Sequence, residues 1–599
     1  MSETSQEYRI YYGPNLEAPF AAAIVEFAPD FAVRLPTTDL RKALRELLPP
    51  ELKLTIAWPD TPLYLAELAA LLANGFQDLR GPNSLPHHAT MRDGGRWRVV
   101  IGFCNDDAAV MALRGAVGLA HAVFALASGL QADRRRLGPF LSQTAAMSNY
   151  QPDYIARALI RAARKRGIPV VPLASGTAMW VYGEGKFAVQ FSEAATHRDS
   201  QIGMRLSGDK FRMAELLRSL GLPATDQMLV HAPQHAVQAA RRLGYPVVIK
   251  PIRGSKGRGV SIGLKDDAAV TAAFAKARGD NSSEPVLVER LVEGDDLRLS
   301  VFGGHLLRAS RLVPPHVIGD GIATVSQLIE AENRSRSDAD VASGLLVRLT
   351  LDSEMVALIR DQGFGLSDVP PAGRRVLLRR NSNLATGGKL EDVTEELHPD
   401  NRIMAETIAR VLHLDAVGID FMTTDPALSW RESKAAVIEV NATPGIGDVL
   451  AERIIAQKFK GDGRVPAILI LDGAPDTARS IAGWLKDKGL QVGETGPDGT
   501  RLGSEQRFIA EAPLPARIRA LLLDPACEAL VVRALPGEVA QSGLPYAKFG
   551  LAIVAGPDAL AADVDTLIVT HAGRVLRGTG DRSTLAAAVE DLLRAGAGA

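Results

Sequence analysis

The sequence predicts a multidomain protein of mixed α/β and α+β architecture. The chain has 599 residues, which is enough for several domains. Short β-branched runs alternate with Ala- and Leu-rich stretches of helical spacing along most of its length. Near the middle, residues 245–262 have the pattern of a strand, a glycine-rich loop and a second strand. We therefore expect three regions, at residues 1–150, 151–463 and 464–599.

Composition and charge exclude several classes of partner. The formal net charge is -1 and no long run of one sign occurs, so neither a nucleic acid nor a membrane is expected as a partner. The two cysteines, Cys104 and Cys527, match no zinc or disulfide spacing, which fits a reducing cytoplasm.

The apolar stretch 108–130 contains Arg114 and His121, so we expect a buried helix there. The N-terminal residues show no signal-peptide pattern.

Residues 1–150 are expected to form strands and helices, and no residue pattern in them indicates a particular chemistry. Strands are expected at residues 8–12, 22–27 and 97–103, and a helix at 106–128. His87 and His88 stand among Pro, Gly and Asn residues. We expect an ordinary loop at this histidine pair, because no carboxylate is spaced to complete a metal site.

The middle region alternates helices and strands. Helices are expected at residues 153–166, 210–219, 235–243 and 400–412. Strands are expected at residues 170–173, 186–191, 286–289, 297–302, 306–312 and 376–379. A loop is expected over 314–321, mixed helix and loop over 322–375, and a polar glycine-rich loop over 381–388.

The glycine-rich loop near the middle has the residues of a phosphate-binding flap. The strand before it ends in Lys250, and the loop contains Lys256, Gly257 and Gly259. Glycines let backbone N–H groups turn toward phosphate oxygens, and lysines add positive charge. The loop does not have the spacing of a Walker A loop and no helix follows it directly. We expect it to close over the phosphates of a nucleotide.

Two apolar strands with acidic residues give the strongest signal. Asp420 lies within residues 416–421, and Glu439 and Asn441 lie in a second apolar run. Glu439 and Asn441 are two residues apart, so they face the same side of a strand. Three oxygen donors on neighbouring strands suit Mg²⁺, whereas two unrelated buried acids would leave unpaired charges in a core. Together with the lysines upstream, the pattern predicts a metal–nucleotide site.

A further strand ends in residues that suit an adenosine. Residues 286–289 form an apolar run that ends in Glu289 and continues into a short hinge. Such a strand end can pair its backbone with the adenine edge, while a carboxylate takes the exocyclic amine or the ribose hydroxyls. Taken alone, the same pattern also fits an ordinary strand with solvated acids.

The order of these features resembles the ATP-grasp superfamily and, over residues 186–446, the ATP-grasp domain of the cyanophycin synthetase family. The matching stretches are VVIKPIRGSKGRGVSI, VLVERLVEGDDLRL, RLVPPHVIGDGIATVSQLI, LLRRNSNLATGG, LHPDNRIMAETIARVLHLDAVGIDF and VIEVNATPGI. The match through the loops at 313–321 and 381–388 is specific to that family, because general ATP-grasp ligases do not share these two loops. The run YYGPN near the N-terminus also resembles the family, and we expect residues 1–150 to bind substrate or polymer or to have a structural role.

This resemblance implies ATP-dependent amide ligation through an acylphosphate, with ATP and Mg²⁺ as cofactors. It implies metal ligands at Asp420, Glu439 and Asn441 and arginines that bind the carboxylate and the acylphosphate at Arg298, Arg311 and Arg379. The implied ATP-binding residues are Lys210, Lys250, Lys256, Gly257, Gly259, Glu289, Arg290, Leu291, Val292 and Asp296. The implied substrate-binding residues are His316, Asn383, Thr386, Gly387 and Gly388.

Residues 464–599 resemble the Mur-ligase-like domain that follows the ATP-grasp domain in that family. Where a Mur ligase has its phosphate loop, residues 471–477 read LDGAPDT, with no lysine and no GK[ST]. Arg533 stands where the family has a metal-binding glutamate. We expect a truncated, catalytically inactive domain that serves packing or oligomerisation. The combination resembles the type 2 class of the family, which implies one active site that polymerises ready-made β-aspartyl-arginine dipeptides.

The resemblance implies a dipeptide substrate and a polymer primer as partners, and we expect a homodimer first and a tetramer second. Two alternatives stay open. One is an ATP-grasp ligase that makes a related peptide or polymer, such as a glutamate-based one. The other is a non-catalytic scaffold partner of a full-length synthetase, although the complete set of lysines and acidic residues argues against it. ATP-dependent phosphate release with different acceptors discriminates between them.

Overall fold

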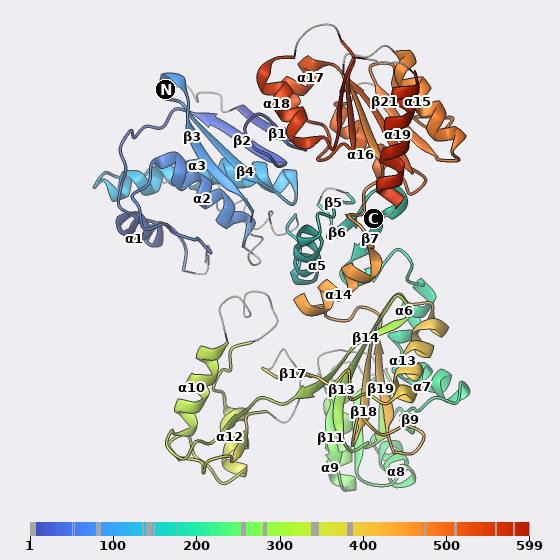
Figure 1. Cartoon of the computed structure of the whole chain (residues 1–599). Coiled ribbons are helices and arrows are strands. Elements are labelled where there is room, and N and C mark those ends of the chain that lie inside the picture. The colour runs from blue at the N-terminus through green and yellow to red at the C-terminus, as the bar shows by residue number, and fades with distance from the viewer. Residues whose placement is uncertain are drawn as a thin grey trace. The chain divides into compact units, whose positions relative to one another are not determined.

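The computed structural model of the chain is shown in Figure 1. It describes residues 7–50, 52, 54–79, 85–133, 137–138, 147, 150–174, 176–252, 259–279, 284–336, 347–379, 387–471, 475–507, 509, 512–556, 560–578 and 582–597. The chain divides into two compact units. Unit 1 comprises residues 1–192 and 459–599, and unit 2 comprises residues 193–458.

Unit 1 begins with an antiparallel sheet covered by helices. The sheet has the order β1-β2-β4-β3, with β1 (Glu7–Tyr11), β2 (Ala22–Phe27), β3 (His87–Met91) and β4 (Trp97–Gly102). Its helices are α1 (Thr37–Leu47), α2 (Leu65–Gln77) and α3 (Asp106–Ala127). The Asn105 side chain caps α3 by accepting a hydrogen bond from the Ala108 N–H, which satisfies one of the free donors of the first turn. The expected strands and helix are confirmed.

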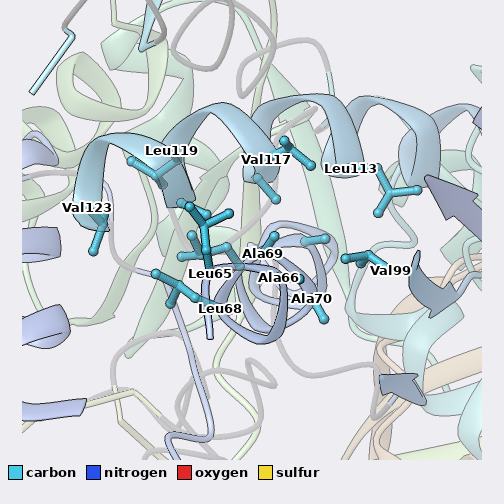
Figure 2. Close-up of a cluster of buried hydrophobic side chains, with 14 of the residues drawn as sticks. Leu65, Ala66, Leu68, Ala69, Ala70, Val99, Leu113, Val117, Leu119 and Val123 are labelled. Carbon is cyan, nitrogen blue, oxygen red and sulfur yellow. The ribbon is translucent and has the colours of Figure 1, made fainter. Parts of the chain in front are cut away.

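Helix α3 forms the centre of this part of unit 1. Among the described residues it is the one helix whose length and composition would let it cross a membrane. Its buried side chains include Leu113, Val117 and Val123, and they pack with Leu65 and Leu68 of α2 in one hydrophobic cluster (Figure 2). The expectation of a buried core helix is confirmed.

The expectation of a loop at His87 and His88 is wrong. Both residues begin β3, where His87 pairs with Ile101 and His88 with Val100 in an antiparallel ladder with β4. The ladder hydrogen bonds to an apolar strand stabilise β3, although its own residues have little strand propensity.

A second difference lies at residues 186–191. The expected strand starts later, because Gly185–Phe187 form a 3₁₀ turn and β7 covers Val189–Ser192. The Lys186 N–H donates to the Cys527 carbonyl at 2.9 Å, and a Cβ on Gly185 would lie 2.1 Å from that same oxygen. A contact with a distant part of unit 1 therefore imposes the turn. The neighbouring elements α5 (Tyr154–Lys165), β5 (Val170–Pro172) and β6 (Met179–Tyr182) include the helix and the strand expected at 153–166 and 170–173.

The rest of unit 1 is a mostly parallel sheet with helices. Its order is β23-β22-β21-β24-β20-β25-β26, and the pairs from β21 to β26 in this order are parallel. The strands are β20 (Ala467–Leu471), β21 (Val492–Gly496), β22 (Gly499–Leu502), β23 (Glu505–Arg507), β24 (Ala529–Ala534), β25 (Leu551–Val554) and β26 (Val575–Arg577). The helices are α15 (Pro475–Asp487), α16 (Leu514–Leu522), α17 (Pro536–Ser542), α18 (Ala562–His571) and α19 (Arg582–Ala597). Strands β20 and β25 are buried at every residue, as expected when helices cover both faces of a sheet.

Unit 2 contains two antiparallel sheets that bear most of the expected site. The first has the order β11-β10-β12-β9, with β9 (Gln227–Val230), β10 (Val247–Pro251), β11 (Ser261–Leu264) and β12 (Val286–Arg290). The second has the order β17-β14-β13-β18-β19, with β13 (Asp295–Phe302), β14 (His305–Val313), β17 (Lys389–Asp392), β18 (Ala416–Thr423) and β19 (Ala436–Asn441). The helices of this unit include α6 (Gln201–Ser207), α7 (Lys210–Ser219), α8 (Pro233–Leu243), α9 (Asp267–Arg278), α13 (Pro399–Leu412) and α14 (Asp448–Lys458).

A small two-stranded sheet in unit 2 corrects one further expectation. The predicted loop at 314–321 contains β15 (His316–Ile318), which pairs with β16 (Arg375–Leu377). A strand of three residues has almost no sequence signal of its own, and its partner is distant in the chain. Helices α10 (Val325–Ser335) and α12 (Ser353–Asp361) share a buried apolar cluster with this sheet.

Candidate functional site

Three neighbouring strands place charged residues in one row. Arg298 on β13 lies directly opposite Asp420 on β18, and Asp420 lies opposite Glu439 on β19. Residues that are directly opposite in an antiparallel sheet project from the same face. Asn441 is two residues beyond Glu439 on β19, so it shares this face. The structure therefore brings the three expected metal ligands together on adjacent strands.

Two positively charged side chains contact the carboxylates of this row, and one of them is Arg298 itself. The Arg298 Nε atom lies 2.5 Å from Asp420 Oδ1, and the Lys210 Nζ atom lies 3.1 Å from Glu439 Oε1. Lys210 begins α7, whose first turn is capped by the Asp209 side chain. Burial raises the pKa of Asp420 to about 7, because the nearby carboxylates add to the effect and Arg298 only partly opposes it.

Asp420 and the nearby Asp296, two residues before Arg298 on β13, each have a buried carboxylate oxygen. Burial raises the pKa of Asp296, and the charge of Glu439 adds to this effect. Oδ1 of Asp296 and Oδ1 of Asp420 are buried and accept no well-aligned hydrogen bond from a described residue, so the contact between Asp420 and Arg298 is an ion pair alone. A buried polar atom without a hydrogen bond costs about 1–3 kcal/mol, and a hard cation would remove that cost.

The donor set fits Mg²⁺ shared with a phosphate. Within the described ranges, no three His, Cys, Asp or Glu side chains are placed to hold a metal ion by themselves. The expected ligands are two carboxylates and the amide oxygen of Asn441. Mg²⁺ commonly combines one or two carboxylates with water and phosphate oxygens, so this set fits a metal–nucleotide site.

A buried ion pair joins β10 to β12 in the other sheet of unit 2. The Lys250 Nζ atom lies 2.8 Å from Glu289 Oε1, and the two side chains are 6% and 5% exposed. The hydroxyl of Thr225 lies 3.5 Å from the same carboxylate oxygen. The Glu289 carboxylate is therefore engaged by Lys250, and its adenosine role stays a prediction. Sequence reasoning missed Thr225, because only the folded sheet places it near Glu289.

The hinge after β12 and the end of the flap adjoin the two strands that bear this pair. The Leu291 N–H donates to the Pro246 carbonyl at 3.2 Å, and Arg290 Nε lies 3.2 Å from a carboxylate oxygen of Asp226. Gly259 has a φ of +73°, and a Cβ there would lie 3.0 Å from a Pro251 side-chain carbon. Val292 is partly exposed beside Leu291. Lys256 and Gly257 lie outside the described residues.

The three expected catalytic arginines have different partners. Arg298 contacts an expected metal ligand, Asp420, whereas the other two pair with different acids. Arg311 on β14 lies 2.8 Å from Asp295 and 3.4 Å from Glu391. Arg379 donates two hydrogen bonds, of 2.9 and 2.5 Å, to Asp352, whose carboxylate also caps α12.

The expected substrate residues are described in part. His316 Nδ1 lies 2.9 Å from the Pro314 carbonyl and 3.2 Å from Arg375 Nη2. Gly387 and Gly388 are buried, whereas Asn383 and Thr386 lie outside the described residues.

A buried arginine that sequence reasoning missed holds this glycine pair. The Gly387 carbonyl accepts a hydrogen bond of 2.8 Å from Arg336, which is 2% exposed. Arg336 also donates to Glu332 at 3.0 Å. Sequence reasoning had no signal for Arg336, because an arginine at the end of a polar helix has the pattern of a surface charge.

Comparison with known proteins finds relatives of this chain. A family model described as an ATP-grasp domain matches residues 204–302. A cyanophycin synthetase of Nostoc sp. is 30% identical over 500 residues, which cover 79% of this chain and 54% of the relative. That of Geminocystis herdmanii is 28% identical over 84% of this chain and 60% of its own length. The chain thus spans little more than half the length of these relatives.

More distant similarities concern glutathione-forming proteins. A glutathione biosynthesis bifunctional protein of Streptococcus agalactiae is 30% identical over 36% of this chain and 30% of its own length. A crystal structure of a bifunctional glutathione synthetase from Pasteurella multocida matches 59% of this chain and 51% of its own, at 22% identity and a TM-score of 0.42. Residues 204–302 thus match an ATP-grasp domain, and most of the chain is similar in sequence to cyanophycin synthetases.

Proposed function

We propose that this protein is an ATP-dependent carboxylate–amine ligase that extends cyanophycin by adding β-aspartyl-arginine dipeptides. The observation that carries the proposal is the row formed by Arg298, Asp420 and Glu439, with Lys210 at 3.1 Å from Glu439. The similarity to cyanophycin synthetases over 79% of the chain supports the choice of polymer.

The charges of unit 2 suit a nucleotide triphosphate. Lys210 and Lys250 offer ammonium groups that attract phosphate oxygens once their carboxylate partners have another counter-charge. Asp420, Glu439 and Asn441 would hold Mg²⁺, which would neutralise charge on the phosphates during transfer. Asp296 and the hinge residues 289–292 take the adenosine, and the flap excludes water from the reacting groups.

The reaction consists of two displacements. A carboxylate oxygen at the C-terminus of the polymer attacks the γ-phosphorus of ATP, ADP leaves, and an acylphosphate forms. The α-amine of the dipeptide then attacks the acyl carbon, inorganic phosphate leaves, and the amine loses a proton. Arg298 binds the acylphosphate, because a guanidinium fork matches such an anion and Arg298 already lies in the row. Arg311 and Arg379 assist only if their present ion pairs open.

The remaining regions have supporting roles in this proposal. Residues 464–599 act as an inactive Mur-ligase-like domain: the run LDGAPDT lacks a lysine, and Arg533 pairs with Asp498. The protein works in the cytoplasm as a homodimer, with a tetramer as the second expectation. A native mass measurement that finds only monomer would contradict the oligomer.

The deciding experiment measures phosphate release from ATP by the purified full chain. The primer is a cyanophycin-type polymer, and the acceptor is either β-aspartyl-arginine dipeptide or free aspartate plus arginine. We expect release and polymer growth with the dipeptide alone. Release with neither acceptor set would reject the proposed substrate, and glutamyl acceptors would be tested next. Failure to bind Mg-ATP would reject the ligase itself.

A further inference from the structure

Unit 1 contains a cavity that is lined by none of the residues expected for the ligase reaction. Its volume is about 390 Å³, which lies within the range of ~300–1,000 Å³ that is typical of small-molecule sites. The walls come from the start of the chain, from β5 and from α16 with the segment after α17. Most of the lining is apolar, and it includes Phe103, Val171, Ile518, Leu522 and Pro545.

Opposite charges meet at a tyrosine on the wall of this cavity. The Tyr12 hydroxyl donates to Asp106 Oδ2 at 2.6 Å. Burial and Asp106 raise the pKa of Tyr12, whereas the charge of Arg519 lowers it, so both charged groups act on the same hydroxyl. Arg519 donates from Nη2 to the Pro172 carbonyl, and within the described part of the chain its other nitrogens make no hydrogen bond. An anion and a cation thus both line the cavity.

A second polar group on the wall, the Glu184 carboxyl, already contacts two neighbours. Glu184 lies 3.2 Å from Arg464 Nη1 and accepts a hydrogen bond from the Tyr546 hydroxyl. Because Arg464 and Tyr546 satisfy its carboxylate, Glu184 adds polarity to the wall without demanding a ligand charge. The charges left for a ligand are those of Asp106 and Arg519.

We propose that this cavity binds a small zwitterion with an apolar body, that is, a free amino acid with an aliphatic or aromatic side chain or a dipeptide of such residues. Asp106 accepts hydrogen bonds from the α-ammonium group, and Arg519 donates to the α-carboxylate. The apolar walls take the side chain and exclude charged side chains such as those of aspartate and arginine. The site lies in unit 1, whereas the residues expected for the ligase reaction lie in unit 2.

The first test measures binding to the full chain by isothermal titration calorimetry. The probes are leucine, phenylalanine and the Leu-Leu dipeptide, with leucinamide and N-acetyl-leucine as analogues that lack one charge each. We expect the zwitterions to bind and both analogues to bind about tenfold more weakly, because each lacks one of the two charges that Asp106 and Arg519 would bind. Free amino acids and the dipeptide form separate arms, so the tighter arm identifies the source. Absence of binding by every zwitterion at millimolar concentration would overturn the proposal.

Matched variants locate the site. Asp106→Asn keeps the size and the Tyr12 hydrogen bond but removes the charge, and Arg519→Lys keeps the charge but removes the fork. We expect Asp106→Asn and Arg519→Met each to weaken leucine binding about tenfold, with Arg519→Lys in between. Arg594→Met is the control, because that side chain is 78% exposed on α19. Equal affinity in Asp106→Asn, Arg519→Met and the control would overturn the proposal.

A covalent label gives a readout that is independent of global stability. Cys104 lines the cavity, whereas the other cysteine, Cys527, is fully buried. Saturating leucine should slow the labelling of Cys104 by a small maleimide severalfold, as followed by intact-mass spectrometry. The same leucine concentration should leave the rate unchanged in Arg519→Met. Labelling at one rate with and without leucine in the wild type would contradict the proposed place of binding.

Discussion

The ion pair between Lys250 and Glu289 is the most deeply buried pair of charges at the candidate site, and its stability depends on both partners. The two side chains are 6% and 5% exposed and 2.8 Å apart. Removing one partner of such a pair leaves a charge in a medium that solvates it poorly, and this costs more than the pair itself contributes. The pair therefore reports on whether the flap strand and its neighbour fold as described.

Replacing Lys250 should destabilise the protein strongly. We expect Lys250→Met to lower the free energy of unfolding by about 3–5 kcal/mol, because it leaves the buried Glu289 carboxylate without a counter-charge. The double variant Lys250→Met/Glu289→Gln should lose clearly less than the sum of the two single changes. Urea unfolding followed by circular dichroism measures all four proteins. Additive losses would show that the two side chains do not interact.

Glu439 should matter for turnover much more than for folding. Glu439→Gln removes a charge from the expected metal ligands with almost no change in volume, so phosphate release should fall by about two orders of magnitude. The lost pair with Lys210 is partly exposed, so it should cost about 1 kcal/mol or less. Glu396→Gln, an exposed position in the same unit, serves as the control for the assay. Retained turnover in Glu439→Gln would mean that the metal site is misassigned.

At the scale of elements, the connection between β12 and β13 depends on a glycine. Gly294 has a φ of +133°, and a Cβ there would lie 2.3 Å from the Thr423 carbonyl of β18. The close approach holds the start of β13, and with it Asp296, against β18. Gly304, in the turn between β13 and β14, also has a positive φ of +79°, but a Cβ at that position would have no neighbour within 4 Å among the described residues.

These two glycines allow a matched comparison. Gly294→Ala should lower the free energy of unfolding by about 1–3 kcal/mol more than Gly304→Ala, because both variants strain the backbone but only the first meets a neighbouring strand. Gly294→Ala should also raise the KM for ATP, since it displaces the start of β13. Thermal unfolding and steady-state kinetics measure the two effects. Equal losses in both variants would show that the strand contact is unimportant.

At the scale of the whole molecule, unit 1 unites residues 1–192 with residues 459–599, and both segments contribute to the surroundings of a buried carboxyl. Burial raises the pKa of Glu184 from 4.5 to about 7, although Arg464 and the Tyr546 hydroxyl oppose the shift. A carboxyl with a raised folded-state pKa binds a proton more tightly in the folded protein. The stability that it contributes is therefore present at about pH 4.5 and falls as the pH rises toward 7.

This linkage predicts a pH-dependent effect of one substitution. Glutamine resembles the protonated form of Glu184, so Glu184→Gln should leave stability near pH 5 almost unchanged. Above pH 7 the charged wild-type carboxyl is the less favourable group, so the variant should be the more stable protein there. The difference in thermal midpoint between the two proteins, measured from pH 5 to pH 8, should grow with pH. A constant difference over that range would show that Glu184 titrates normally.

Much of the fold followed from local patterns. The β-branched run before Lys250, the apolar run around Asp420 and the capped helix that starts at Lys210 all form where the sequence predicts them. The alternation along β19 likewise placed Glu439 and Asn441 on one face. These features depend on residues that are close in the chain, so backbone geometry and side-chain period are sufficient to predict them.

Partners and contacts between distant segments came only from the tertiary structure. No local pattern indicated that Lys250 engages Glu289, that Arg336 holds Gly387, or that His87 begins a strand. The apolar cavity beside Tyr12 is of the same kind, because its walls come from segments hundreds of residues apart. The sequence by itself determined where the strands and helices that bear the candidate site lie and which side chains they present. Only the fold decided strand register and burial, because both depend on which distant segments pack together.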